Sequence, residues 1–139
     1  MKALIKLIRM TKGKVDEQRQ AIGRIQLRLN QVNQQIDALQ NHLNQERKVG
    51  DTSFDGTWAF YEYAENVDRH LQRLARQKKE IQLQLEREQE RLRPLYAELK
   101  TLEITSARYQ ERARQAEARK EQQQMDEFAV LRASFKAET

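Results

Sequence analysis

The chain has 139 residues, of which 38% are hydrophobic and 34% are charged, and its net charge is +5. It is long enough for one domain, but this composition leaves too little apolar material for a thick globular core. The chain has no cysteine, which excludes disulfides, thiolate metal sites and cysteine nucleophiles. No stretch reaches the roughly 20 apolar residues that span a bilayer, and the N-terminus lacks a secretory signal. We therefore expect a cytoplasmic protein without direct membrane insertion.

The first third of the chain carries apolar residues at alternating spacings of three and four. This heptad pattern is typical of a coiled coil and predicts a helix over residues 2–48. The polar Thr11 and Gln18 also occupy this seam, so we expect its N-terminal end to be the weaker one. The apolar seam positions are Leu4, Ile8, Val15, Ile22, Ile25, Leu29, Val32, Ile36, Leu39 and Leu43.

A turn is predicted at residues 49–56, where two glycines flank Asp and Ser residues. Asp55 or Thr57 is the expected N-cap of the next helix, because both side chains can accept a hydrogen bond from a free backbone amide. The seam spacing then resumes and predicts a second helix over residues 57–135. Lys78 and Glu88 interrupt its seam, and Pro94 predicts a kink near residues 90–94 that need not end the helix.

Two long helices joined by a short turn pack antiparallel. We therefore predict an all-α fold, a long antiparallel two-helix coiled-coil hairpin that forms one domain over residues 1–139. Pairing of Leu4 with the neighbourhood of Leu102 leaves roughly 30 residues of the second helix beyond the start of the first. The prediction thus includes a C-terminal helical overhang.

The sequence contains no recognisable catalytic or cofactor motif. Its four glycines lie too far apart to form a phosphate-binding loop, and no Ser/His/Asp constellation is present. His42 and His70 lack the carboxylate cluster that would complete a metal site. We expect no enzyme activity and no cofactor.

The N-terminal segment is strongly basic. Residues 1–14 hold five bases and no acid, whereas residues 49–63 hold three acids and no base. A basic amphipathic start is compatible with a membrane surface, a nucleic acid or an acidic protein cavity. Residues 101–139 hold seven bases and seven acids, a balance that disfavours nucleic acid. The five bases of residues 1–14 are Lys2, Lys6, Arg9, Lys12 and Lys14.

Five of the nine aromatic residues lie in one window of ten residues at the predicted turn. They either close the end of the coiled coil or form an exposed docking patch. Phe60 alone fits the seam register, and the neighbouring acids favour a basic partner. The five residues are Phe54, Trp58, Phe60, Tyr61 and Tyr63.

Two segments resemble the FliJ family of bacterial flagellar export proteins. One is the C-terminal part, with Lys100-Thr101-Leu102-Glu103, Arg108 and Gln122-Gln123-Gln124-Met125-Asp126-Glu127-Phe128-Ala129. The other is the aromatic start of the second helix, with Trp58, Tyr61 and Leu71. The hairpin layout extends the resemblance over nearly the whole chain. Stalk proteins of virulence type III secretion systems share this layout.

The resemblance implies a non-enzymatic cytoplasmic stalk, peripheral at the inner-membrane export apparatus. Its paired terminal helices would enter the pore of a hexameric export ATPase, and its hairpin end would point to the export-gate membrane protein. Family members also assist export chaperones. The implied ATPase-binding residues are Lys2, Lys6, Arg9, Lys12, Lys14, Met125, Asp126, Glu127 and Phe128. The implied export-gate residues are Trp58, Phe60, Tyr61 and Tyr63.

Two other interpretations stay open. The chain could be the stalk of a virulence injectisome, which has the same layout. It could also be a general coiled-coil adaptor or chaperone that grips partner helices along its flanks.

Overall fold

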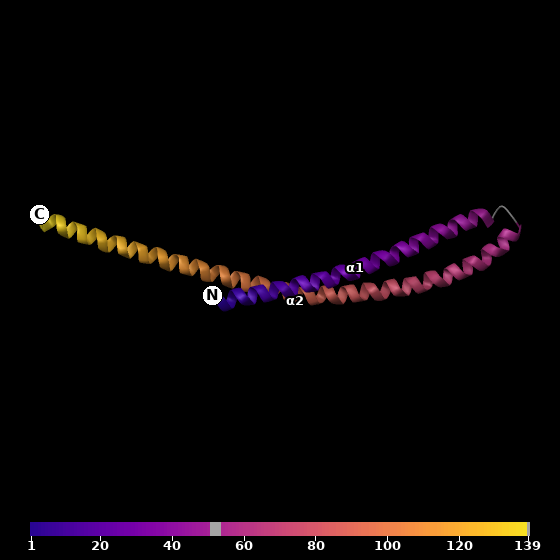
Figure 1. The fold of residues 1–139 in the computed structure, drawn as a ribbon, viewed down its shortest axis with the longest axis horizontal. Helices are drawn as coiled ribbons and strands as arrows, with labels where there is room; N and C mark the ends of the chain where they lie inside the picture. The colour runs from indigo at the N-terminus through magenta and orange to yellow at the C-terminus, as the bar shows by residue number, and fades with distance from the viewer. Residues whose placement is uncertain (51–53, 139) are drawn as a thin grey trace. The chain divides into compact units, whose positions relative to one another are not determined.

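The protein is a helical hairpin in a computed structural model that describes residues 1–50 and 54–138, with the side chains of residues 1–49 and 58–138. Helix α1 spans Lys2–Gly50 and helix α2 spans Phe54–Glu138, with no strand in the described ranges (Figure 1). The predicted all-α hairpin is thereby confirmed.

The two helices extend further toward the turn than the sequence indicated. Gly50 belongs to α1, whereas Phe54, Asp55 and Gly56 belong to α2. The expectation that Asp55 or Thr57 caps α2 is therefore wrong, since both lie inside the helix. Heptad spacing places the seam but contains no information on where a helix ends, and a glycine near a terminus is a weak stop signal. The rest of the predicted turn, residues 51–53, lies outside the described residues.

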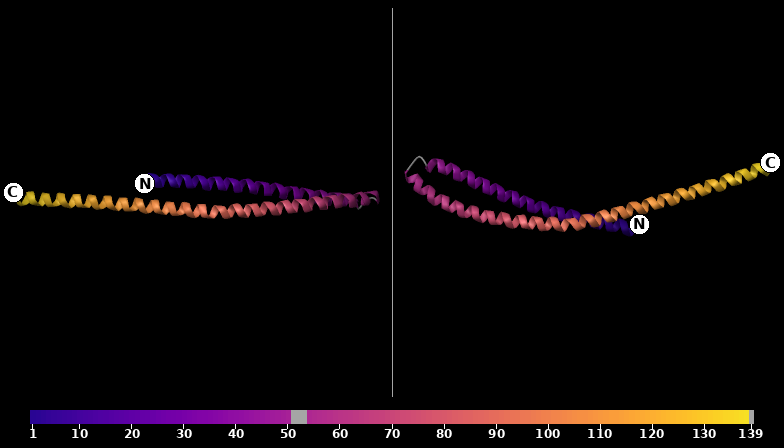
Figure 2. Two further views of the ribbon diagram at one scale, coloured as in Figure 1. Left: turned by 90° about the horizontal axis from the view of Figure 1, so that it is seen from below. Right: turned by 180° about the vertical axis from the view of Figure 1, so that it is seen from behind.

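Two compact units make up the chain. One is Lys14–Leu95, and the other combines Met1–Gly13 with Tyr96–Thr139. In the Lys14–Leu95 unit the two helices lie side by side and antiparallel in each view (Figures 1 and 2). The prediction that the whole chain forms one domain stays a prediction.

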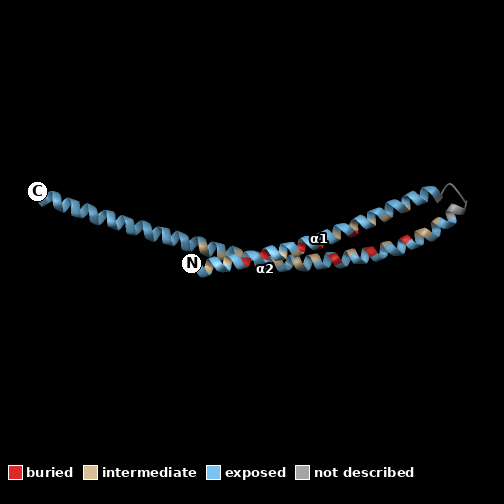
Figure 3. Cartoon of the chain, in the orientation of Figure 1, coloured by how far each residue is buried: buried red, intermediate tan, exposed pale blue. Residues whose placement is uncertain are grey.

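The core of the Lys14–Leu95 unit is a single seam between the helices. Ile25 and Val32 of α1 form one cluster with Leu74 and Ile81 of α2, and Figure 3 shows buried positions in red on both helices. Their exposed fractions are 2–6%, and burial of such a side chain contributes about 1.5–3 kcal/mol. The partly buried residues packed against the cluster are Leu29, Ile36, Leu39 and Leu85. The five on α1 occupy seam positions that the heptad pattern predicts.

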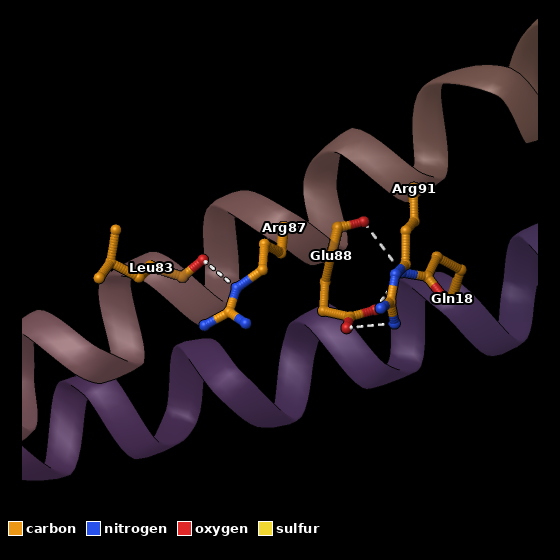
Figure 4. Close-up of polar contacts among 5 residues, drawn as sticks. All are labelled: Gln18, Leu83, Arg87, Glu88 and Arg91. Carbon is orange, nitrogen blue, oxygen red and sulfur yellow. Dashed lines mark hydrogen bonds and ion pairs between the residues drawn. The ribbon is translucent and has the colours of Figure 1, made fainter.

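Two polar seam positions pair with each other. The amide Nε2 of Gln18 on α1 donates to the backbone oxygen of Glu88 on α2, at 2.9 Å, and to its carboxylate Oε2, at 2.7 Å (Figure 4). Glu88 also accepts from Arg91 at 2.9 Å, and its side chain is only 17% exposed. The interruption at Glu88 and the weak position at Gln18 are thus one polar layer across the hairpin. A polar layer of this kind favours a single register, because any slip separates its partners.

The second unit contains the start of α1 and the distal part of α2. Leu4 and Ile8 are half-buried, as are Leu99 and Leu102, and Thr11 is 3% exposed. Beyond Ser106 every described residue of α2 is exposed, through residue 138. The predicted overhang is therefore present and covers 107–138.

Pro94 lies inside α2 without ending it. The residue is exposed, so the carbonyl that loses its amide donor lies on a face of the helix that water reaches. The kink expected near residues 90–94 stays a prediction.

Replacing Glu88 with Ala is expected to lower the free energy of unfolding by about 1–3 kcal/mol, because the half-buried amide of Gln18 loses its carboxylate acceptor. Urea unfolding followed by circular dichroism measures the loss. The exposed Glu86 of the same helix provides the control, and Glu86→Ala should change stability little.

The double variant Gln18→Leu/Glu88→Leu is expected to unfold at higher urea than the parent chain, because leucines extend the apolar seam and the partner that Arg91 loses is replaced by water at its exposed side chain. Equal stability of the parent chain and Glu88→Ala would show that the polar layer contributes nothing.

Candidate binding surfaces

The aromatic residues near the turn fall into two groups. Trp58 is 71% exposed and Tyr61 65% exposed, whereas Phe60 and Tyr63 are half-buried. One pair packs toward α1 and the other faces solvent, and the docking role of the exposed pair stays a prediction. The side chain of Phe54 lies outside the described residues.

The inward pair contacts the last turns of α1. The hydroxyl of Tyr63 is hydrogen-bonded to Nδ1 of His42, and the two rings meet edge to face with centroids 5.4 Å apart. The ring of Phe60 lies 5.8 Å from the guanidinium carbon of Arg47, a cation–π distance. Nε2 of His42 is 3.8 Å from a carboxylate oxygen of Glu46.

Tyr63 lies outside the seam register in the sequence, and its contact with His42 was not predicted. Neither residue occupies a seam position, but both flank the seam, where long side chains reach across to the partner helix. The signal that could have found this contact is the register. His42 and Tyr63 are about equidistant from the turn on opposite helices.

The outward pair, Trp58 and Tyr61, lies at the N-terminal end of a polar stripe on α2. Tyr61 lies next to Glu65, Asp68 and Arg69 on one helical face, since residues three and four apart share a face. Asp68 accepts a hydrogen bond from Gln72 at 3.2 Å, and Glu65 lies 3.8 Å from Arg69. Exposed aromatic rings beside acids are suited to a protein partner that carries bases.

The predicted bases at the start of α1 are all exposed. Lys2, Lys6, Arg9 and Lys12 belong to the unit with the distal part of α2, and Lys14 belongs to the Lys14–Leu95 unit. The first turn of α1 contains no acid. The first 14 residues of the chain therefore present five exposed bases and no acid.

Exposed apolar side chains accompany these bases. Leu4 and Ile8 are half-buried in the seam, whereas their neighbours Ile5 and Leu7 are 47% and 48% exposed, and Met10 is 54% exposed. The start of α1 thus has more apolar side chains than its seam uses. In the sequence these extra apolar residues appear as the adjacent pairs Leu4-Ile5 and Leu7-Ile8. The exposed member of each pair enlarges the candidate surface.

The C-terminal candidate residues form a separate surface. Met125 and Phe128 are each 67% exposed, and they lie with Glu121, Gln124 and Arg132 on one face of α2. Asp126 accepts a hydrogen bond from Gln122 at 3.1 Å. Met125 lies 19 residues beyond Ser106, the last half-buried residue of α2, or about 28 Å of helix. The structure does not bring these residues into contact with the basic start of α1.

Neither a metal site nor a membrane span is found in the described residues. No three side chains of the metal-binding types lie close enough together there to hold an ion. None of the helices in residues 1–50 and 54–138 combines the length and the apolar character needed to cross a membrane.

Comparison with known proteins gives one result. The family model described as "Flagellar FliJ protein" matches residues 1–138. No curated protein and no solved structure matches the chain.

Replacing Tyr63 with Phe is expected to lower the free energy of unfolding by about 0.5–1 kcal/mol, because the variant keeps the ring but loses the hydrogen bond to His42. Tyr61→Phe, at an exposed position two residues away, should leave it unchanged. Urea unfolding of both variants distinguishes them, and equal effects would contradict the division into inward and outward aromatics.

Proposed function

The chain belongs to the FliJ family of flagellar proteins, and we propose that it is the stalk that couples the flagellar export ATPase to the export gate. Membership of this family implies a non-enzymatic stalk role in flagellar export. In this role the unit with the start of α1 inserts into the hexameric ATPase. The turn end of the hairpin binds the cytoplasmic domain of the export-gate membrane protein.

The observation that best supports the ATPase contact is the basic start of α1. Positive side chains in the first turn of a helix oppose its macrodipole, each at a cost of about 0.3–1 kcal/mol at exposed sites. Lys2 and Lys6, one turn apart, also repel each other. Since these residues reduce the stability of their own helix, binding to an acidic surface of a partner explains their presence better than folding does.

Stimulation of the ATPase would then come from ring assembly. A single hairpin inside a ring of six subunits contacts only some of them at a time, so it changes activity by favouring the assembled state or particular subunit conformations. The C-terminal surface around Met125 and Phe128 would provide further apolar contacts to the same ring. ATP hydrolysis itself would belong to the ATPase.

The exposed aromatics support the contact at the other end. Trp and Tyr side chains dominate the energetics of protein interfaces because they bury large areas at low entropic cost. Trp58 and Tyr61 are the most exposed of the described aromatics near the turn. We propose that they carry the gate contact, with Phe60 and Tyr63 positioning the start of α2 against α1.

Binding of export chaperones by the helix flanks is part of the same proposal, and so is a peripheral location at the inner membrane. The family match is to a flagellar protein, which favours this role over an injectisome stalk. A general coiled-coil adaptor would share the fold, but the opposite ends of its hairpin would have no reason to differ in charge.

Reversing the charge of three bases at the start of α1, in the variant Lys2→Glu/Lys6→Glu/Arg9→Glu, is expected to abolish stimulation of the cognate export ATPase. Helicity should be retained, because acids near a helix N-terminus are favourable. The control variant Arg73→Glu/Arg76→Glu/Lys79→Glu has the same change in net charge at exposed positions of α2 and should still stimulate. Full stimulation by the first variant would place the ATPase contact elsewhere.

Trp58→Ala is expected to weaken binding to the cytoplasmic domain of the export-gate protein about 30-fold, or about 2 kcal/mol, as for a hot-spot residue. Isothermal titration calorimetry measures the change. Leu83→Ala removes an apolar side chain that is 47% exposed on α2 and should bind normally. If both variants bind equally well, Trp58 is not part of the contact.

A further inference from the structure

The overhang, residues 107–138 of α2, is a helix of about 48 Å whose described side chains are all exposed. It still carries an apolar stripe in which Met125 and Phe128 are 67% exposed and Leu131 is 59% exposed. Most of the stability of a protein helix comes from packing of its apolar face. A stripe of this size therefore indicates a surface that a partner covers.

Charge divides the overhang into two halves of opposite sign. Residues 107–120 hold five bases and two acids, a net charge of +3, whereas residues 121–138 hold four acids and two bases, a net charge of −2. The balance of the whole segment conceals this division. The bases of the first half are Arg108, Arg112, Arg114, Arg119 and Lys120.

Pairing within the helix leaves this division in place. Arg114 donates to both carboxylate oxygens of Glu111, at 2.7 and 3.1 Å, and this hydrogen bonding, together with the positive charge of Arg114, lowers the pKa of Glu111. Each half still has an excess of one sign once this pair is set aside.

We propose that residues 107–138 pair antiparallel with the same segment of a second copy of this chain. In that arrangement the basic half of each copy lies beside the acidic half of the other, twice over around a twofold axis. Parallel pairing would place like charges side by side.

This pairing does not rest on the proposed function. Because it covers Met125 and Phe128, self-association and an ATPase contact at these residues exclude each other.

The first test is the mass of the full-length chain by sedimentation velocity at about 1 to 100 μM, a range that resolves micromolar dissociation constants. At low salt we expect twice the 16.6 kDa mass of one chain. At about 1 M salt, where the Debye length falls to about 3 Å, the mass should fall to that of one chain. A monomer at low salt over the whole range overturns the proposal, and so does a dimer that salt does not weaken.

Charge-reversal variants test the pairing itself. The basic-half variant Arg112→Glu/Arg119→Glu/Lys120→Glu and the acidic-half variant Glu121→Lys/Asp126→Lys/Glu127→Lys should each be monomeric alone and form a dimer when mixed. The variant Arg73→Glu/Arg76→Glu/Lys79→Glu should dimerise like the parent chain. Circular dichroism confirms that each variant is helical. If either overhang variant dimerises alone as tightly as the parent chain, the proposal is wrong.

Fluorescence energy transfer between labelled copies determines whether the two overhangs pair antiparallel or parallel. The chain has no cysteine, so Gln110→Cys and Ala137→Cys each introduce a single labelling site, and the two sites are about 40 Å apart along one helix. Mixing donor-labelled Gln110→Cys with acceptor-labelled Ala137→Cys should give strong transfer. Transfer only between two copies labelled at residue 110 would show parallel pairing and overturn the proposal.

Discussion

One apolar seam between two helices holds this protein together, and the rest of the structure depends on it. The described core consists of Val15, Ile22, Ile25 and Val32 on α1 with Val67, Leu74 and Ile81 on α2. A two-helix structure has no second layer, so apart from the buried Thr11 the other described side chains lie on the surface or are only partly buried. Because this surface is large and the core is thin, function has to come from what the exposed side chains present and from where the hairpin places them.

The two ends of the hairpin differ in chemistry. The start of α1 combines bases with apolar side chains that the seam leaves exposed, whereas the start of α2 presents Trp58 and Tyr61 beside acids. Membership of the FliJ family places the chain in flagellar export, and a long helical protein with two distinct ends is suited to coupling one machine to another. Within the Lys14–Leu95 unit the polar layer of Gln18 and Glu88 favours a single register, because any slip separates its partners.

The sequence predicted the hairpin, the seam and the overhang, because heptad spacing follows directly from the geometry of packed helices. It did not predict the ends of the helices at Gly50 and Phe54, since spacing carries no information about termini. It also identified Gln18 and Glu88 as separate weaknesses, although they hydrogen-bond to each other. That pairing depends on the exact register, as does the contact of Tyr63 with His42. The division of the aromatics into inward and outward pairs likewise required the three-dimensional structure.

The central claim is that this chain couples an export ATPase to the export gate without catalysing hydrolysis itself. The most direct measurement is the ATPase activity of the cognate export ATPase, titrated with this protein while the size of the ATPase oligomer is followed. The account predicts that activity and ring formation rise together and saturate near one hairpin per six ATPase subunits. No effect on either activity or ring formation would contradict it.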